Sequence, residues 1–262
     1  MAAITWLEFQ FYPGHTYLQG DTQLYLPMLE RMNAPGFLSR DLVATHPNVA
    51  YTIYDELTLF LHAATHVDFA TALKTQQIIC RAAAILGIFF LASSAGIGDV
   101  VALIIAALVN LGAMLSAPAV LLVDPEPLPR AFAFGLILLA AGLLAREKPL
   151  LAGLSGGMAL VYDAPLAAPF WLAVLIAFFV DRSLRRLLRP SLTILLVFVL
   201  LLANLAQLQP GVVESHDLFS KVSEPFAFIQ QYRTPFVWVS LWPAGEMWHY
   251  AAIVLCGLWA AA

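Results

Sequence analysis

The sequence predicts an all-α protein, a polytopic bundle of transmembrane helices with short amphipathic surface helices in its first outer loop. Hydrophobic residues make up 61% of the 262 residues and charged residues only 11%, whereas soluble domains carry about 25% charged residues. The mean hydropathy is +0.82. One long polar segment, residues 20–66, precedes a series of apolar runs. We therefore expect one transmembrane domain over residues 1–262, with an outer loop at 19–74 and about six to eight membrane helices at 75–262.

Both ends of the chain lie within apolar sequence. Residues 2–18 are apolar and aromatic but contain Glu8 and Pro13, and they are shorter than the about 20 apolar residues that a membrane crossing needs. Residues 250–262 form an apolar run with no charge after it. We expect a chain that is truncated at both ends, and a short natural chain with irregular ends is the alternative.

The outer loop contains two segments with helical periodicity. Residues 23–32 and 54–66 each place apolar side chains on one face and polar side chains on the other. This pattern is typical of short amphipathic helices that lie along a membrane surface. Pro35, Gly36 and Pro47 lie between the two segments and predict an irregular turn.

The apolar runs after the loop predict the membrane helices. They cover residues 75–95, 100–123, 131–145, 150–162, 166–180 and 192–208, and then 236–262 with a break at Pro243. Residues 150–162 and 166–180 are shorter than a full crossing and flank Asp163, so we expect a tight hairpin of short helices, with one kinked segment as the alternative. Gly153 and Gly157 lie four residues apart, a spacing typical of close helix packing.

Basic residues predict the orientation of the bundle, because short loops rich in Lys and Arg face the cytoplasm. Two loops carry them, one with Arg146 and Lys148, the other with Arg182, Arg185, Arg186 and Arg189. The predicted hairpin returns the chain to the side from which it came, so both loops lie on that side. Counting spans from there places the 20–66 loop, residues 124–130, the Asp163 turn and residues 209–235 on the outer face.

Composition and spacing exclude several functions. The formal net charge is −4 and no basic run is interleaved with aromatic residues, so we expect no nucleic-acid partner. Cys80 and Cys256 lie far apart in apolar runs, as expected for packing thiols. His62 and His66 share a helix face, but the sequence HAATH lacks the Glu of the metalloprotease motif. The sequence indicates no metal site, identifies no cofactor and leaves the oligomeric state open.

Asp21 is the first candidate for chemistry. It follows Gly20 just beyond the apolar N-terminal stretch, where a carboxylate can take a proton from an acceptor hydroxyl. The alternative is that Asp21 caps the helix that begins near residue 23. Arg40 and Asp41 form a second pair. The guanidinium suits a phosphate and Asp41 suits a metal ion or an orienting role, with simple anchoring of the loop as the alternative.

A second candidate segment is DPEPLPR, residues 124–130, in which three prolines stiffen a short turn. Ionisable groups at such a depth are costly and tend to mark functional sites. The alternative is structural: Glu126 complements the positive end of a helix, and Arg130 extends towards the membrane surface. Arg81, inside the first clear span, either meets a lipid phosphate near the outer surface or extends in the same way.

The segments GDTQLYLP, NAPGFLSRD and EPLPR resemble uncharacterised bacterial members of the GT-C superfamily of integral-membrane glycosyltransferases. The resemblance covers most of the chain and implies a bacterial inner-membrane protein with the 20–66 loop on the periplasmic side. It implies transfer of a sugar from a polyprenyl-phosphate donor to an acceptor at the outer face, with Asp21 as catalytic residue and Asp41 as a second acidic candidate. The residues that would hold the substrate and its phosphate are Arg40, Arg81, Glu126 and Arg130. Two features depart from the family: the first span is absent or truncated, and the YDAP turn lacks the expected His-Pro.

Two other classes of membrane protein fit parts of the sequence. A transporter or flippase would need polar residues deep in the spans, such as Asn110 and Arg81, and internal repeats, which the sequence does not show. A non-catalytic membrane scaffold protein would use the outer carboxylates only as caps and anchors.

Overall fold

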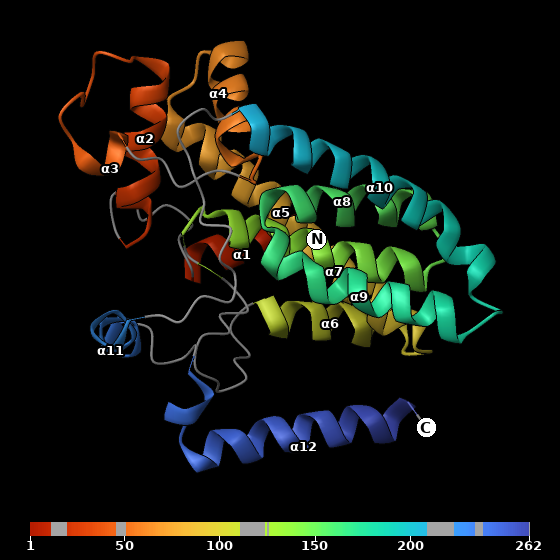
Figure 1. Ribbon diagram of the computed structural model, residues 1–262. Coiled ribbons are helices and arrows are strands. Elements are labelled where there is room, and N and C mark those ends of the chain that lie inside the picture. Colours follow the sequence, from red (N-terminus) through yellow and green to blue (C-terminus); the bar gives the residue numbers. More distant parts are fainter. Residues whose placement is uncertain are drawn as a thin grey trace. The chain divides into compact units, whose positions relative to one another are not determined.

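The computed structural model describes residues 1–11, 20–45, 51–110, 124, 126–208, 223–233 and 238–261 (Figure 1). Every regular element among them is a helix, so the all-α prediction is confirmed. The chain divides into two compact units, residues 1–112 with 123–212, and residues 113–122 with 213–262.

The first unit holds ten described helices. They are α1 (Ala2–Phe11), α2 (Thr22–Asn33), α3 (Leu42–Thr45), α4 (Tyr54–Thr65), α5 (Phe69–Ser94), α6 (Asp99–Asn110), α7 (Pro129–Ala145), α8 (Pro149–Tyr162), α9 (Ala164–Val180) and α10 (Arg185–Leu208). The two amphipathic segments predicted in the outer loop are α2 and α4, within two residues of the expected bounds.

The second unit contains α11 (Glu224–Arg233), the 3₁₀ helix η2 (Val239–Leu241) and α12 (Ala244–Ala261). Helix α12 begins directly after Pro243, the residue at which the sequence predicted a break. Trp242 stacks on Tyr250 with ring centroids 5.2 Å apart. Most of the predicted 209–235 outer loop, and the second half of the predicted 100–123 span, lie outside the described residues.

Helix boundaries follow from local capping chemistry. Asp68 accepts a hydrogen bond from the Thr71 backbone N–H at 2.8 Å and starts α5 at Phe69, inside the predicted 19–74 loop. Similarly, α10 begins at Arg185 rather than at residue 192. In both cases the apolar pattern marks where the sequence becomes mostly hydrophobic, whereas the helix starts several residues earlier, at Phe69 after the Asp68 cap in α5 and at Arg185 in α10.

The core of the first unit is formed by closely packed helices. Helices α5 and α7 approach so closely that a side chain at Gly135 would collide with the Cys80 backbone, and one at Gly87 with the Leu138 backbone. Helix α8 packs against both α7 and α10. Gly153 and Gly157 of α8 face Ser191 and Phe198 of α10, which confirms their predicted role in packing.

The segment around Asp163 forms a helical hairpin. Helix α8 ends at Tyr162 and α9 begins at Ala164, with Asp163 accepting a hydrogen bond from the Leu166 N–H at 3.0 Å. The Trp171 indole N–H of α9 donates to the Gly156 carbonyl of α8 at 3.0 Å. The chain therefore reverses at Asp163 instead of continuing as one kinked helix.

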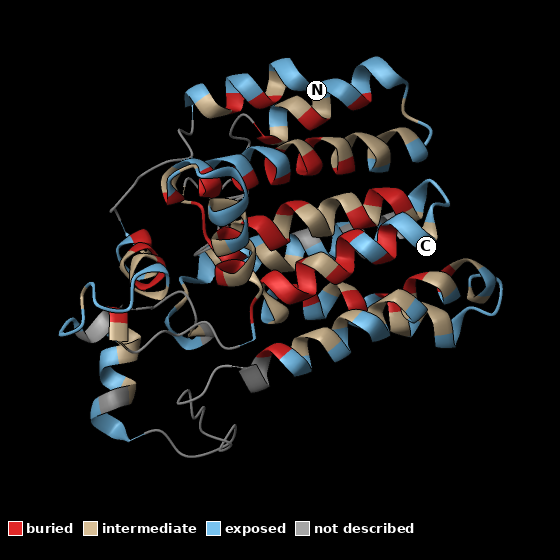
Figure 2. Ribbon diagram, turned by 90° about the horizontal axis from the view of Figure 1, so that it is seen from above, coloured by how far each residue is buried: buried red, intermediate tan, exposed pale blue. Residues whose placement is uncertain are grey.

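Two described helices are long and apolar enough to cross a membrane, Phe69–Ser94 and Arg185–Leu205. Over the most apolar 18 residues of each helix, 39% of the stretch is buried inside the protein in Phe69–Ser94 and 11% in Arg185–Leu205. Helices α6 to α9 are apolar but have only 12 to 17 residues. Large apolar side chains are exposed on several of these helices. Figure 2 shows exposed positions in pale blue along the helices. The polytopic bundle remains a prediction.

Candidate functional site

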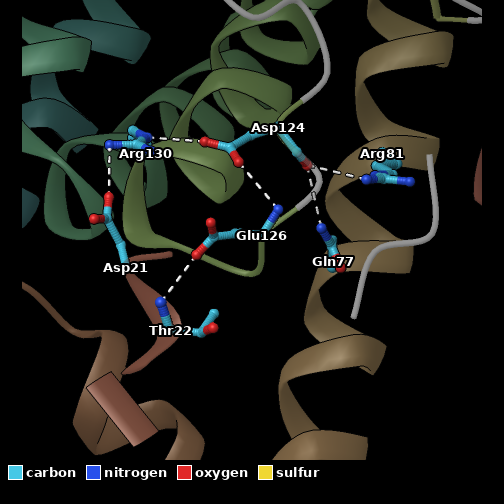
Figure 3. Close-up of polar contacts among 7 residues, drawn as sticks. All are labelled: Asp21, Thr22, Gln77, Arg81, Asp124, Glu126 and Arg130. Atoms are coloured by element: carbon cyan, nitrogen blue, oxygen red, sulfur yellow. Dashed lines mark hydrogen bonds and ion pairs between the residues drawn. The ribbon is translucent and has the colours of Figure 1, made fainter. Parts of the chain in front are cut away.

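The candidate site is built around Arg130, the second residue of α7. Its Nη1 lies 3.2 Å from Asp21 Oδ2, and its Nε donates to Asp124 Oδ2 at 2.8 Å (Figure 3). A cation at a helix N-terminus is disfavoured by the helix dipole, and the two carboxylates offset that cost. We refer to Asp21, Asp124, Glu126 and Arg130 as the Arg130 cluster.

Two members of the Arg130 cluster are accessible. The side chains of Arg130 and Asp21 are 52% and 46% exposed, whereas that of Asp124 is 9% exposed. Asp124 therefore fixes the guanidinium from the buried side. The Asp21 ion pair faces solvent, where ion pairs exchange readily with other charged groups.

Glu126 caps helix α2 in place of Asp21. The Thr22 backbone N–H donates to Glu126 Oε2 at 2.9 Å, while the Asp21 side chain makes no capping hydrogen bond. The structure thus contradicts the alternative in which the Asp21 carboxylate caps α2. Gly20 has a φ of +51°, and a side chain on it would collide with the Glu126 carboxylate. Glycine at position 20 therefore allows the distant Glu126 to reach the helix end.

The turn that carries Asp124 is tied to helix α5. The Asp124 backbone carbonyl accepts hydrogen bonds from Gln77 Nε2 at 3.3 Å and from Arg81 Nη2 at 3.0 Å (Figure 3). Asp124 Oδ1 also accepts from the Glu126 backbone N–H at 3.0 Å. These bonds hold the turn in place from both the backbone and the side chain.

Arg81 is buried and supports the site from behind. Its Nε lies 3.7 Å from Glu8 Oε1, with side-chain exposures of 7% for Arg81 and 1% for Glu8. Its guanidinium lies over the Phe9 ring, 4.4 Å from the centroid. In this position Arg81 joins α1, α5 and the Asp124 turn, which is a positioning role; contact with a lipid phosphate stays a prediction.

Arg40 and Asp41 lie in the segment between α2 and α3. Asp41 Oδ1 accepts a hydrogen bond from the Ala44 N–H at 2.8 Å, so Asp41 caps the short helix α3. Arg40 is exposed. Among the described residues, no ion pair or hydrogen bond joins this pair to the Arg130 cluster. Their proposed roles in catalysis and phosphate binding stay predictions.

A buried polar network beneath the cluster fixes the outer loop to the bundle. The Tyr162 hydroxyl donates to Gln76 Oε1 at 2.8 Å, and Gln76 Nε2 donates to the Thr58 hydroxyl at 3.0 Å. The Tyr54 hydroxyl donates to the Pro127 carbonyl at 2.9 Å. Sequence reasoning missed these residues. Two adjacent amides, Gln76 and Gln77, early in an apolar helix are the signal that could have indicated them.

Tyr25 and Asp163 border the Arg130 cluster. Burial raises the pKa of the Tyr25 hydroxyl, and the charge of Asp21 adds to this effect. Burial also raises the pKa of Asp163, while its backbone hydrogen bond and Arg130 act in the opposite direction. Asp163 therefore lies near Arg130 and near Tyr25 of the outer loop, while the placement of these segments on the outer face stays a prediction.

His62 of α4 and His66, directly after the helix, serve local structure. His62 Nδ1 lies 2.6 Å from the Val67 carbonyl, and its ring stacks on Phe69. His66 adopts a left-handed conformation at the end of α4. Within the described ranges, no group of three or more His, Cys, Asp or Glu side chains is arranged to hold a metal ion.

Comparisons with known protein families, curated proteins and solved structures find no match to this chain. The geometry of the Arg130 cluster and the pattern of the sequence are therefore the basis for assigning a function.

Proposed function

We propose that the chain is an integral-membrane glycosyltransferase that moves a sugar from a polyprenyl-phosphate donor to an acceptor at the outer membrane face. One observation supports this assignment most strongly. Glu126 accepts the hydrogen bond from the Thr22 N–H at the start of α2, so the Asp21 carboxylate is not used as the cap. Asp21 Oδ2 lies 3.2 Å from Nη1 of the half-exposed Arg130. During glycosyl transfer the acceptor hydroxyl loses a proton and the leaving phosphate gains negative charge. A carboxylate can take that proton, and a guanidinium beside it can stabilise the phosphate.

In the proposed reaction, the acceptor oxygen attacks the anomeric carbon of the donor sugar. The bond from that carbon to the phosphate oxygen breaks, and polyprenyl phosphate leaves with the bonding electron pair. Asp21 takes the proton from the acceptor hydroxyl. Arg130 stabilises the negative charge on the leaving phosphate. Bonds and charge balance without a further reactant.

The surrounding residues set this geometry. Asp124 holds the Arg130 guanidinium, Glu126 holds the start of α2, and Arg81 holds the Asp124 turn. Arg40 and Asp41 are proposed to meet the substrate from the outer loop.

Placement in a membrane is supported by the exposed apolar surface, and we propose the bacterial inner membrane. Leu172 and Ile176 of α9 and Val197 and Leu200 of α10 are more than half exposed. Soluble proteins rarely leave such extended apolar faces in water, whereas lipid would cover them. The charge distribution favours an outer, periplasmic position for the 20–66 loop.

The test is transfer by the full-length chain in liposomes, with a panel of polyprenyl-phosphate-linked hexoses and pentoses and release of polyprenyl phosphate as the readout. We expect Asp21→Asn to slow release about 100-fold or more, the usual contribution of a general base. Asp181→Asn is the matched control, because Asp181 is an exposed carboxylate bonded to Ser183, far from the Arg130 cluster along α9. No release by the wild-type chain, or full activity in Asp21→Asn, would contradict the proposal.

A transporter or flippase is the second candidate, and the buried Glu8 and Arg81 ion pair favours it. Solute or lipid flux that depends on Glu8 and is unaffected by Asp21→Asn would support that class. A folded chain with neither transfer nor flux would indicate the membrane scaffold.

A further inference from the structure

Six cations gather at the end of the bundle opposite the Arg130 cluster, and we call this region the basic end. Its members are Arg146, Lys148, Arg182, Arg185, Arg186 and Arg189. Two contacts join its two turns to the helices around them. The Ser191 hydroxyl of α10 donates to the Pro149 carbonyl at 2.7 Å, and Arg146 donates to the Ser93 hydroxyl at the end of α5.

The basic end carries a strong local charge. Six of the thirteen Lys and Arg residues lie there, together with two of the seventeen acidic residues, Glu147 and Asp181. Its formal charge is therefore +4, and the rest of the chain, which is −4 in total, carries −8. A patch of one sign raises the local concentration of oppositely charged groups and so favours an anionic partner.

Four of these cations are exposed and lie outside the hydrogen bonds that hold the helix ends. Arg185 donates to the Phe178 and Phe179 carbonyls, each at 3.0 Å, and so satisfies the last turn of α9. Arg146 bonds Ser93 and lies over the Phe90 ring. The four exposed cations outside these hydrogen bonds are Lys148, Arg182, Arg186 and Arg189.

Exposed apolar side chains directly adjoin these cations. Phe179 and Val180 precede Arg182, with exposures of 68% and 78%, and Leu150 and Leu151 follow Lys148, with exposures of 59% and 54%. A soluble polyanion would satisfy the cations but leave the apolar groups in water. A phospholipid satisfies both, because its head group and its acyl chains are joined.

We propose that the basic end binds the head groups of anionic phospholipids in one membrane leaflet. The inference shares the membrane placement of the proposed function but none of its chemistry. Arg182, Arg186, Arg189 and Lys148 contact the head groups, and the apolar residues beside them contact the acyl chains.

The experiment titrates the purified full-length chain in detergent micelles with phosphatidylglycerol and, separately, with phosphatidylcholine, and counts retained lipid by native mass spectrometry. The test variant is Arg186→Gln/Arg189→Gln. Its matched control is Arg31→Gln/Lys74→Gln, which neutralises two cations on α2 and the first half of α5. Thermal unfolding of each variant confirms that it is folded.

Each Lys or Arg near an anionic surface contributes about 1 kcal/mol, so loss of two cations should reduce phosphatidylglycerol affinity about thirtyfold. Phosphatidylcholine retention should not change, and the control should bind as the wild type does. If the variant does not fold, 1 M salt should remove the lipid preference of the wild type, because it shortens the Debye length to about 3 Å.

Equal affinity of the wild type for both lipids would overturn the inference, as would an unchanged preference in the variant. Binding of an RNA oligonucleotide to the basic end in preference to phosphatidylglycerol would also overturn it. None of these three results would alter the effect of Asp21→Asn on sugar transfer, so failure of this inference and failure of the proposed function are distinguishable.

Discussion

The two ends of helix α7 use arginine in different ways. Arg130, at its start, lies between Asp21 and Asp124 at 3.2 and 2.8 Å. Arg146, directly after its end, bonds a serine hydroxyl, and none of the described cations of the basic end forms an ion pair with a carboxylate. The 17 residues of α7 span about 25 Å.

This difference fits the two kinds of recognition that we propose. At the Arg130 cluster, each charge is fixed by named partners, which suits a reaction at one atom. At the basic end, exposed charges add together without a fixed geometry, which suits a surface of many head groups. Substitutions at the two ends should therefore affect different properties.

The largest effect on stability should follow Arg130→Ala. It leaves the nearly buried Asp124 carboxylate without its cation and brings two acidic residues together without compensation. Because Arg130 and Asp21 are about half exposed, we discount the 3 to 5 kcal/mol of a fully buried pair and expect a loss of about 2 kcal/mol. Chemical unfolding in detergent measures it, and Arg186→Ala, at the basic end, should change the stability by less than about 0.5 kcal/mol. Equal losses of unfolding free energy in Arg130→Ala and Arg186→Ala would contradict the distinction between the Arg130 cluster and the basic end.

A smaller effect should appear as pH dependence. Burial, a hydrogen bond with Glu56 and repulsion by Glu56 raise the pKa of Asp55 in α4 from 3.8 to about 8. Between these values the folded protein holds a proton that the unfolded chain has released, so stability should fall as the pH rises from 4 to 8 and then level off. The loss should be at least about 1.4 kcal/mol, the equivalent of one pKa unit.

Thermal unfolding at pH 5 and pH 8.5 measures this loss, and Asp55→Asn should remove the part of it that comes from Asp55. Asp181→Asn, at the other end of the bundle, should leave the pH dependence unchanged. A wild-type stability that rises between pH 5 and 8 would show that Asp55 is ionised in the folded protein.

The smallest effect concerns the cap of α2. Glu126→Ala removes the acceptor of the Thr22 N–H and should cost about 1 kcal/mol, together with a loss of sugar transfer as Asp21 moves relative to Arg130. Glu126→Gln retains an acceptor oxygen and should keep most of the stability. If both variants transfer sugar at the wild-type rate, Glu126 does not position Asp21.

The outer-loop helices could be predicted from sequence because their signals are local. Apolar residues at helical spacing identified α2 and α4, and the Asp163 break identified the hairpin. The start of α5 could not be found in this way, because Lys74 and Gln76 interrupt the hydropathy pattern while Asp68 starts the helix by capping it.

The relations within the candidate site could be predicted only in part. The grouping of the 20–66 loop with the 124–130 turn followed from counting spans. The cap between Glu126 and Thr22 joins residues 104 positions apart, and no local pattern encodes such a contact. The same holds for Tyr162 and Gln76, which are 86 positions apart. Asp41, by contrast, accepts its capping hydrogen bond from the N–H three residues further on. Its anchoring role could therefore be predicted from the local sequence.

The central claim is that the Arg130 cluster and the basic end face opposite sides of a membrane. Single cysteines at Ser39, in the outer loop, and at Ser183, beside the basic end, test it in a background with Cys256→Ser, since Cys256 is exposed and Cys80 is buried. Both serines are exposed. With a membrane-impermeant maleimide added to intact right-side-out vesicles, we predict labelling of Ser39→Cys at once and of Ser183→Cys only after the vesicles are opened. Labelling of both positions in intact vesicles, or the reverse order, would contradict the claim.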